Sequence, residues 1–172
     1  MNLKDILLKE KVHTKKQAMA VVHYACRSKA HFEELIACFL SNEYRVAQRA
    51  AWSVSWAALE KPEMILPYTE ALVRQLQRKN VHPAVVRNSV RVLEKMAIPE
   101  KYHGEVMNAC FGFIESSETP VAVKVFSLTA LYNLSETYPE IKQELALLIE
   151  DRIDNESAAF KSRANKILKQ LK

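Results

Sequence analysis

Apolar and polar residues alternate along this chain with the period of an α-helix. The stretch YRVAQRAAWSVSWAALEK, residues 44–61, is one example. Its small or apolar residues Val46, Ala50, Ser53 and Ala57 would share one face of a helix, which has about 3.6 residues per turn. No stretch of the sequence shows the sustained two-residue alternation of a β-strand. The pattern therefore predicts an all-α fold.

The breaks between these helical patterns carry helix-start signals. A proline follows a capping residue at His82 and Pro83, and Thr14 with Gln17 has the spacing of a capping box. Pro67 falls inside a helical pattern, where it is expected to kink the helix or restart it. The predicted helices are 2–11, 14–27, 28–41, 43–60, 62–79, 83–97, 101–115, 119–136, 139–153 and 157–171.

Several of the predicted helices repeat one pattern around a shared anchor position. The anchors Val46, Val86, Val123 and Phe160 are spaced 40, 37 and 37 residues apart. Small or apolar residues recur four, seven and eleven positions after each anchor, so these positions are predicted to face the core. Ala18 fits as the anchor of a shorter first repeat.

The repeated segments resemble a known helical family. HPAVVRNSVRVLEKMA (82–97) and TPVAVKVFSLTALYNL (119–134) both contain Pro-x-x-Val followed by a basic residue. This start, with a small residue four positions after the anchor, resembles the second helix of a HEAT repeat, a helical hairpin of roughly 37–47 residues. The resemblance covers nearly the whole chain. It implies a single domain over residues 1–172, a right-handed α-solenoid of about five HEAT-like hairpins and about ten helices, with armadillo-like stacking as the near neighbour.

In such a solenoid, the side of each second helix that lies opposite the core lines a concave groove. Here that side carries a polar and cationic section next to an apolar and aromatic one. This combination suits an amphipathic protein segment, whereas a phosphate backbone would prefer continuous positive charge. We therefore expect a non-catalytic scaffold that binds a protein or peptide partner in this groove. The predicted partner-binding residues are Gln48, Ser55, Asn88, Arg91, Lys95, Leu128 and Tyr132.

A stripe of arginines and tryptophans on the flank of one helix supports an alternative surface. Arg45, Arg49, Trp52 and Trp56 follow one another at helical spacing. The favoured interpretation is packing against the next repeat, with the arginines at the groove edge. The alternative is a nucleic-acid surface, because the stripe is similar in residue types to the DNA-alkylation-repeat proteins, which are also HEAT-like. In that family tryptophans, an arginine and a carboxylate hold a damaged nucleotide. Glu60 would be the carboxylate, but it lies at a helix end and the stripe faces the flank, so no glycosylase role is transferred.

The charge and composition exclude several function classes. The formal net charge of +5 tolerates a polyanionic partner but is modest for a nucleic-acid protein. Two glycines are too few for a P-loop, a dinucleotide-binding loop or a nucleophile elbow. Part of the positive charge lies near the two ends of the chain. The basic segment at the second end finishes with Lys172.

Metal, cofactor and membrane sites are not expected either. His23 and Cys26, with Cys38 on the next predicted helix, lack an evident fourth ligand for zinc. The three cysteines, which include Cys110, form no disulfide framework and favour a reducing cytoplasm. No apolar run approaches the ~20 residues of a membrane span. We therefore expect a cytoplasmic protein with no cofactor, and the pattern specifies no oligomeric state.

Overall fold

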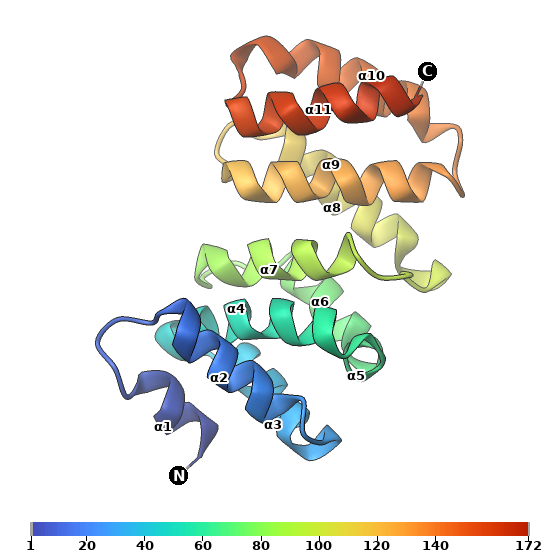
Figure 1. Ribbon diagram of the computed structural model, residues 1–172. Coiled ribbons are helices and arrows are strands. Elements are labelled where there is room, and N and C mark those ends of the chain that lie inside the picture. Colours follow the sequence, from blue (N-terminus) through green and yellow to red (C-terminus); the bar gives the residue numbers. More distant parts are fainter. Residues whose placement is uncertain (1, 172) are drawn as a thin grey trace. The chain divides into compact units, whose positions relative to one another are not determined.

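The computed structural model describes residues 2–171, and every regular element within them is a helix (Figure 1). The predicted all-α fold is confirmed. The last lysine of the predicted basic end, Lys172, lies outside the described residues. The α-helices are α1 (Leu3–Leu8), α2 (Lys15–Ala25), α3 (Lys29–Phe39), α4 (Tyr44–Glu60), α5 (Pro62–Ile65), α6 (Thr69–Gln75), α7 (Pro83–Leu93), α8 (His103–Glu115), α9 (Val121–Ser135), α10 (Ile141–Arg152) and α11 (Ala158–Leu171), and 3-10 turns cover Leu66–Tyr68, Glu100–Tyr102 and Ile153–Asn155.

Each predicted helical range contains a helix, and the local signals explain where several of them begin or break. Thr14 and Gln17 form the predicted capping box at the start of α2. The Nδ1 atom of His82 accepts a hydrogen bond from the backbone N–H of Ala84 at 3.0 Å, so His82 caps α7 as predicted. Pro67 lies in the 3-10 turn that separates α5 from α6, and the fifth predicted helix is therefore restarted there.

The chain divides into two compact units, Met1–Val92 and Leu93–Lys172, and each is described here by itself. The single domain expected from the sequence stays a prediction. Within residues 2–171, no helix combines the length and the apolar character that crossing a membrane requires.

In the first unit, α4 packs against α1, α2 and α3. Most of its buried residues are small, among them Ala50, Ser53 and Ala57, which allow neighbouring helices to approach closely. The Ser53 hydroxyl donates a hydrogen bond to the carbonyl of Ala18 in α2 at 3.2 Å. Large side chains of α3, such as Phe32, fill the remaining space, and each such fully buried side chain contributes ~1.5–3 kcal/mol relative to an exposed one.

In the second unit, α8 and α9 form one helical hairpin and α10 and α11 form the next (Figure 1). α9 is the central helix, because it contacts α8, α10 and α11. Its sequence is apolar almost all round, and the structure buries it accordingly: Leu128 and Leu131 are inaccessible to solvent. The core of this unit also contains Phe160 and Ile114.

The repeat pattern predicted the core-facing side correctly except in the predicted helix 83–97, where α7 ends at Leu93 and the predicted core position Ala97 is exposed. Val46 and Val123 are buried as predicted. In α7, however, Val86 is only half-buried, and Val85 and Ser89 are buried in its place. The prediction for Val86 was wrong because the buried face of α7 is shifted towards Val85 and Ser89, and the Ser89 hydroxyl donates to the Val85 carbonyl at 2.8 Å, which satisfies it inside the core.

Candidate functional site: a cationic hollow

The first unit contains a hollow of about 410 Å³ whose walls are rich in positive charge. Three segments build it: the connection between α1 and α2, the first half of α4, and the start of α7. Among the described residues, none of those lining it is Asp or Glu. We call this site the cationic hollow. Its lining residues are Lys11, Val12, His13, Arg45, Gln48, Arg49, Trp52, His82, Ala84 and Arg87.

Arg49 supplies a buried positive charge that is fixed in place. Only 6% of the residue is exposed. Its guanidinium donates one hydrogen bond to the carbonyl of Leu7, at the end of α1, and another to the carbonyl of Lys11 at 3.0 Å. Because a buried charge is costly without polar partners, these carbonyl dipoles explain how the side chain is tolerated. The bonds also tie the α1–α2 connection to α4 and help to end α1 at Leu8, earlier than the predicted residue 11.

Three further cations stand around the hollow with solvent access. Lys11, Arg45 and Arg87 are all exposed. None of them takes part in an ion pair with another residue of the described chain. Like charges gathered at one concave surface repel each other and raise the local concentration of anions. The hollow is therefore electrostatically suited to an anionic ligand.

The two imidazoles of the hollow respond to this positive field. Burial lowers the pKa of His13 below its ordinary value, and the neighbouring Arg49 lowers it further. Burial, followed by the charge of Arg87, lowers the pKa of His82 in the same way. Since an ordinary histidine has a pKa of about 6.5, the lowered pKa values favour the neutral form of both rings at pH 7. The Nε2 atom of His13 is buried and has no hydrogen-bond partner.

The two tryptophans have different surroundings. Trp52 is half-buried, lines the hollow and meets the edge of His13 at a ring-centroid distance of 6.1 Å. Trp56 lies outside the hollow, where the Nζ atom of Lys15 is 5.3 Å and the Cζ atom of Arg91 is 5.0 Å from its ring centroid. Such cation–π contacts contribute ~0.5–1 kcal/mol each at exposed sites. The predicted stripe therefore separates: Arg45, Arg49 and Trp52 belong to the hollow and Trp56 does not.

The structure corrects part of the predicted groove. Ser55, Asn88 and Leu128 are buried, with at most 2% of each residue exposed, so their side chains are not available to a partner. Ser55 and Asn88 satisfy their polar atoms on the carbonyls of their own helices, and for this reason polar residues at these positions can face inward. Of the remaining predicted residues, Gln48 lines the cationic hollow and Arg91 covers Trp56.

The last two predicted groove residues, Lys95 and Tyr132, come together in the second unit. They line a smaller hollow of about 250 Å³ with Thr129, Asn133, Arg163, Lys166, Ile167 and Gln170. This hollow has an acidic neighbour, because the guanidinium of Arg163 lies 3.4 Å from the buried carboxylate of Glu94. Burial raises the pKa of Glu94, and the charges of Lys95 and Arg163 oppose that rise.

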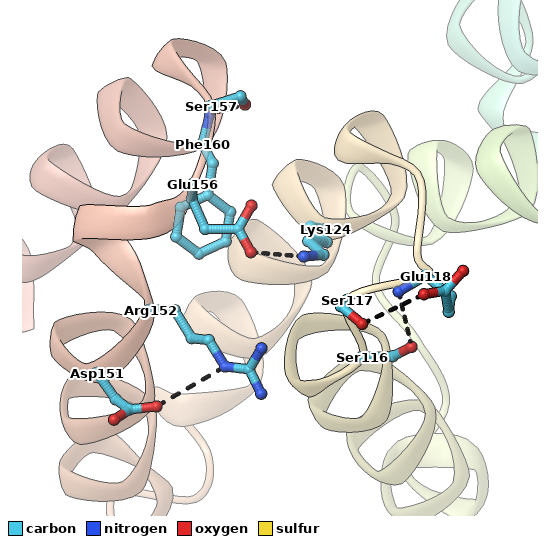
Figure 2. Close-up of polar contacts among 9 residues, drawn as sticks. All are labelled: Ser116, Ser117, Glu118, Lys124, Asp151, Arg152, Glu156, Ser157 and Phe160. Atoms are coloured by element: carbon cyan, nitrogen blue, oxygen red, sulfur yellow. Dashed lines mark hydrogen bonds and ion pairs between the residues drawn. The ribbon is translucent and has the colours of Figure 1, made fainter.

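A second buried ion pair of this unit has a structural role. Figure 2 shows Lys124 of α9 reaching Glu156, which lies just before α11. Only 5% of the lysine side chain and 11% of the glutamate side chain are exposed. Because each charge neutralises the other, the pair links α9 to the start of α11 and leaves little charge for a ligand.

Sequence reasoning identified the α4 residues of the hollow but not the residues that complete it. Lys11 and His13 lie in a connection between helices, where no periodicity marks a shared face. His82 was recognised only as a helix cap, and Arg87 only as part of the repeat. A basic residue follows the anchors Val86 and Val123, but Arg87 is exposed at the hollow whereas Lys124 is buried, so this pattern alone did not identify the hollow.

The three cysteines have raised pKa values because they are partly or fully buried. Burial raises the pKa of Cys26 to about 11 and that of Cys110 to about 12, so both thiols are protonated and weakly nucleophilic at neutral pH. The pKa of Cys38 is also raised by burial. Within residues 2–171, no three His, Cys, Asp or Glu side chains gather as a group that could hold a metal ion.

Comparison with known families agrees with this architecture. The model of the HEAT repeat domain matches residues 5–171. The chain belongs to the HEAT repeat domain family. The match confirms the resemblance and the predicted class of helical-repeat fold. HEAT repeat domains typically serve as protein-interaction scaffolds, because stacked hairpins present extended binding surfaces. No match was found among curated proteins or among solved structures.

Proposed function

We propose that this HEAT repeat protein is a non-catalytic scaffold that binds an acidic segment of a protein partner at the cationic hollow. The observation that carries the proposal is the hollow's lining, where exposed Lys11, Arg45 and Arg87 have no acidic partner in the described chain. A reducing cytoplasmic location is part of the proposal and is supported by the free cysteines Cys26 and Cys38.

Two features favour a peptide over a nucleic acid as the ligand. The positive charge is gathered in one hollow, whereas a duplex needs a series of phosphate contacts along its backbone. The ring of Trp56 is already engaged by Lys15 and Arg91, so Trp52 is the one tryptophan of the stripe that faces the hollow. A peptide could also use the apolar part of the lining, where Val12 is 68% exposed.

A non-catalytic DNA-binding protein is the second candidate. It is supported by Arg45 and Trp52, which lie together at the hollow and could hold a phosphate and stack on a base. Arg49 supports it less, because two of its donor groups are occupied by the carbonyls of Leu7 and Lys11.

The test compares a fluorescein-labelled Glu-rich peptide with a short DNA duplex, each titrated with the protein and followed by anisotropy. We expect the peptide to bind, and the double variant Arg45→Gln with Arg87→Gln to weaken it at least about tenfold, the loss of one charge-assisted hydrogen bond or more. The matched control is Arg74→Gln with Lys79→Gln, which removes the same charge from exposed positions of the first unit outside the hollow.

Tight binding of the duplex, with no binding of the peptide, would overturn the proposal. A duplex ligand would also show its own salt dependence, with affinity falling on a log–log plot with a slope of about −0.9 for each phosphate contacted.

A further inference from the structure

We infer that the cationic hollow receives a phosphorylated side chain of the partner segment, an inference that rests on the proposed function. The inference concerns the group that occupies the hollow, and it goes beyond general attraction between a basic surface and an acidic peptide. It follows from the amount of charge, from the directions of the donors, and from the size of the hollow.

The amount of charge exceeds what one carboxylate can neutralise. Three exposed cations, Lys11, Arg45 and Arg87, surround the hollow, and buried Arg49 adds a fourth. A carboxylate brings a single negative charge, whereas a phosphomonoester carries about −1.5 to −2 at pH 7 on three strong acceptor oxygens. A phosphoryl group therefore matches the hollow better than an aspartate or glutamate side chain.

The donors also come from different directions. Lys11 belongs to the α1–α2 connection, Arg45 to the start of α4, and Arg87 to the first half of α7. The two oxygens of a carboxylate lie in one plane, while the oxygens of a phosphoryl group point towards the corners of a tetrahedron. Donors on three separate elements can each meet one phosphoryl oxygen, and an arginine can do so with two parallel N–H groups.

The imidazole of His82 adds a donor that does not increase the charge. The Nδ1 atom of His82 accepts the N–H of Ala84, so in the neutral ring the proton is on Nε2, which can donate to an anion. Gln48 contributes a side-chain amide to the same lining. A phosphate has more acceptor positions than the cations alone can fill. These neutral groups can donate hydrogen bonds to the remaining positions.

The hollow is larger than a phosphate ion and suits a phosphate attached to a chain. Its volume of about 410 Å³ lies in the range of about 300–1,000 Å³ that is usual for ligand pockets. Val12, Ala84 and Trp52 give part of the lining an apolar character, which can contact the carbon atoms of the side chain and its neighbours.

The experiment uses three peptides that differ at one central residue, which is serine, glutamate or phosphoserine, within the same Glu- and Gly-containing sequence. Each is titrated into the full protein by calorimetry at physiological salt. We expect the phosphoserine peptide to bind at least about tenfold more tightly than the glutamate peptide, the effect of one additional charge-assisted hydrogen bond. The variant Arg45→Gln with Arg87→Gln should remove this preference, while Arg74→Gln with Lys79→Gln should keep it.

The outcomes separate this inference from the proposed function. Equal affinity for the glutamate and phosphoserine peptides overturns the phosphoryl inference and leaves the acidic-peptide scaffold standing. Failure of all three peptides overturns both, and binding of a DNA duplex under the same conditions then identifies the ligand class. Inorganic phosphate is titrated alone as well: if it binds as tightly as the phosphoserine peptide, the hollow recognises a free phosphate and the commitment to a partner's side chain fails.

Discussion

The two units of this protein use the same cationic residue types in opposite ways. In the second unit, Lys124 is buried against Glu156 and Arg163 lies against the buried Glu94. In the first unit, Arg45 and Arg87 line a hollow and form no ion pair within residues 2–171. A neutralised charge inside a core joins helices, while an unneutralised charge at a concave surface attracts a ligand. The comparison predicts which substitutions will change stability and which will change binding.

The largest effect on stability is expected from Lys124→Ala. This change leaves the carboxylate of Glu156 nearly buried without its partner, and breaking such a pair costs ~3–5 kcal/mol. The measurement is urea unfolding followed by circular dichroism. The matched change in the first unit, Arg45→Ala, removes an exposed cation and should alter the free energy of unfolding by no more than about 0.5 kcal/mol.

The reason for the Lys124 effect can be checked with a second variant. Lys124→Met combined with Glu156→Gln removes both charges, and it should recover much of the stability that Lys124→Ala loses. If Lys124→Ala and Arg45→Ala cost the same, the distinction between paired and unpaired cations would have no energetic basis.

Arg49 is a cation of the first unit that has a structural role, as Lys124 has in the second. Arg49→Gln removes the donors to the carbonyls of Leu7 and Lys11, and we expect a loss of ~1–3 kcal/mol. Hydrogen exchange should show faster opening of α1 than of α3. The pKa of His13 should rise in the same variant, because the nearby positive charge is gone, and NMR titration measures this directly.

How far the sequence predicts this protein depends on the physical origin of each feature. Hydrophobic periodicity comes from burial of one helix face, so it located α4 and α9 and their anchors Val46 and Val123. It misplaced Val86, because the buried face of α7 is shifted towards Val85 and Ser89, whose hydroxyl is satisfied on the preceding turn.

The candidate site was only partly accessible to the same reasoning. Arg45, Arg49 and Trp52 share one helix, and helical spacing therefore revealed them. Their joining with residues of the α1–α2 connection and of α7 depends on tertiary packing, which periodicity does not encode. The spacing also gave no sign that Arg49 would be buried on backbone carbonyls while Arg45 stays exposed.

Glu94 and His13, one group in each unit, should contribute to the pH dependence of stability with opposite signs. Burial raises the pKa of Glu94 in the folded state, so the folded chain binds more protons than the unfolded chain between the unfolded value of about 4.3 and the folded value. Glu94 therefore contributes most to the free energy of unfolding below the unfolded pKa, where its carboxyl is protonated. This contribution is lost as pH rises through the folded pKa. Relative to Glu94→Gln, the wild-type free energy of unfolding should fall as pH rises from about 4 towards 7, measured by urea unfolding at each pH.

His13 in the first unit gives the opposite sign. Its folded pKa is lowered by burial and by Arg49, so the unfolded chain binds more protons, and the stability is present above the unfolded pKa of about 6.5 and lost as pH falls through the folded value. Relative to His13→Gln, the wild-type chain should lose stability on acidification. A common sign for Glu94 and His13 would contradict the assignment of their pKa shifts.

The smallest effects are expected in fluorescence, where the two tryptophans distinguish the hollow from its surroundings. Trp52 lines the hollow, whereas Trp56 is covered by Lys15 and Arg91. Binding of the phosphoserine peptide should therefore change the emission of a Trp56→Phe variant, in which Trp52 reports alone, and leave a Trp52→Phe variant nearly unchanged. Because both rings are half-buried, acrylamide should quench them to an intermediate extent before the ligand is added. A ligand-induced change confined to Trp56 would move binding away from the hollow and towards the surface formed by Lys15 and Arg91.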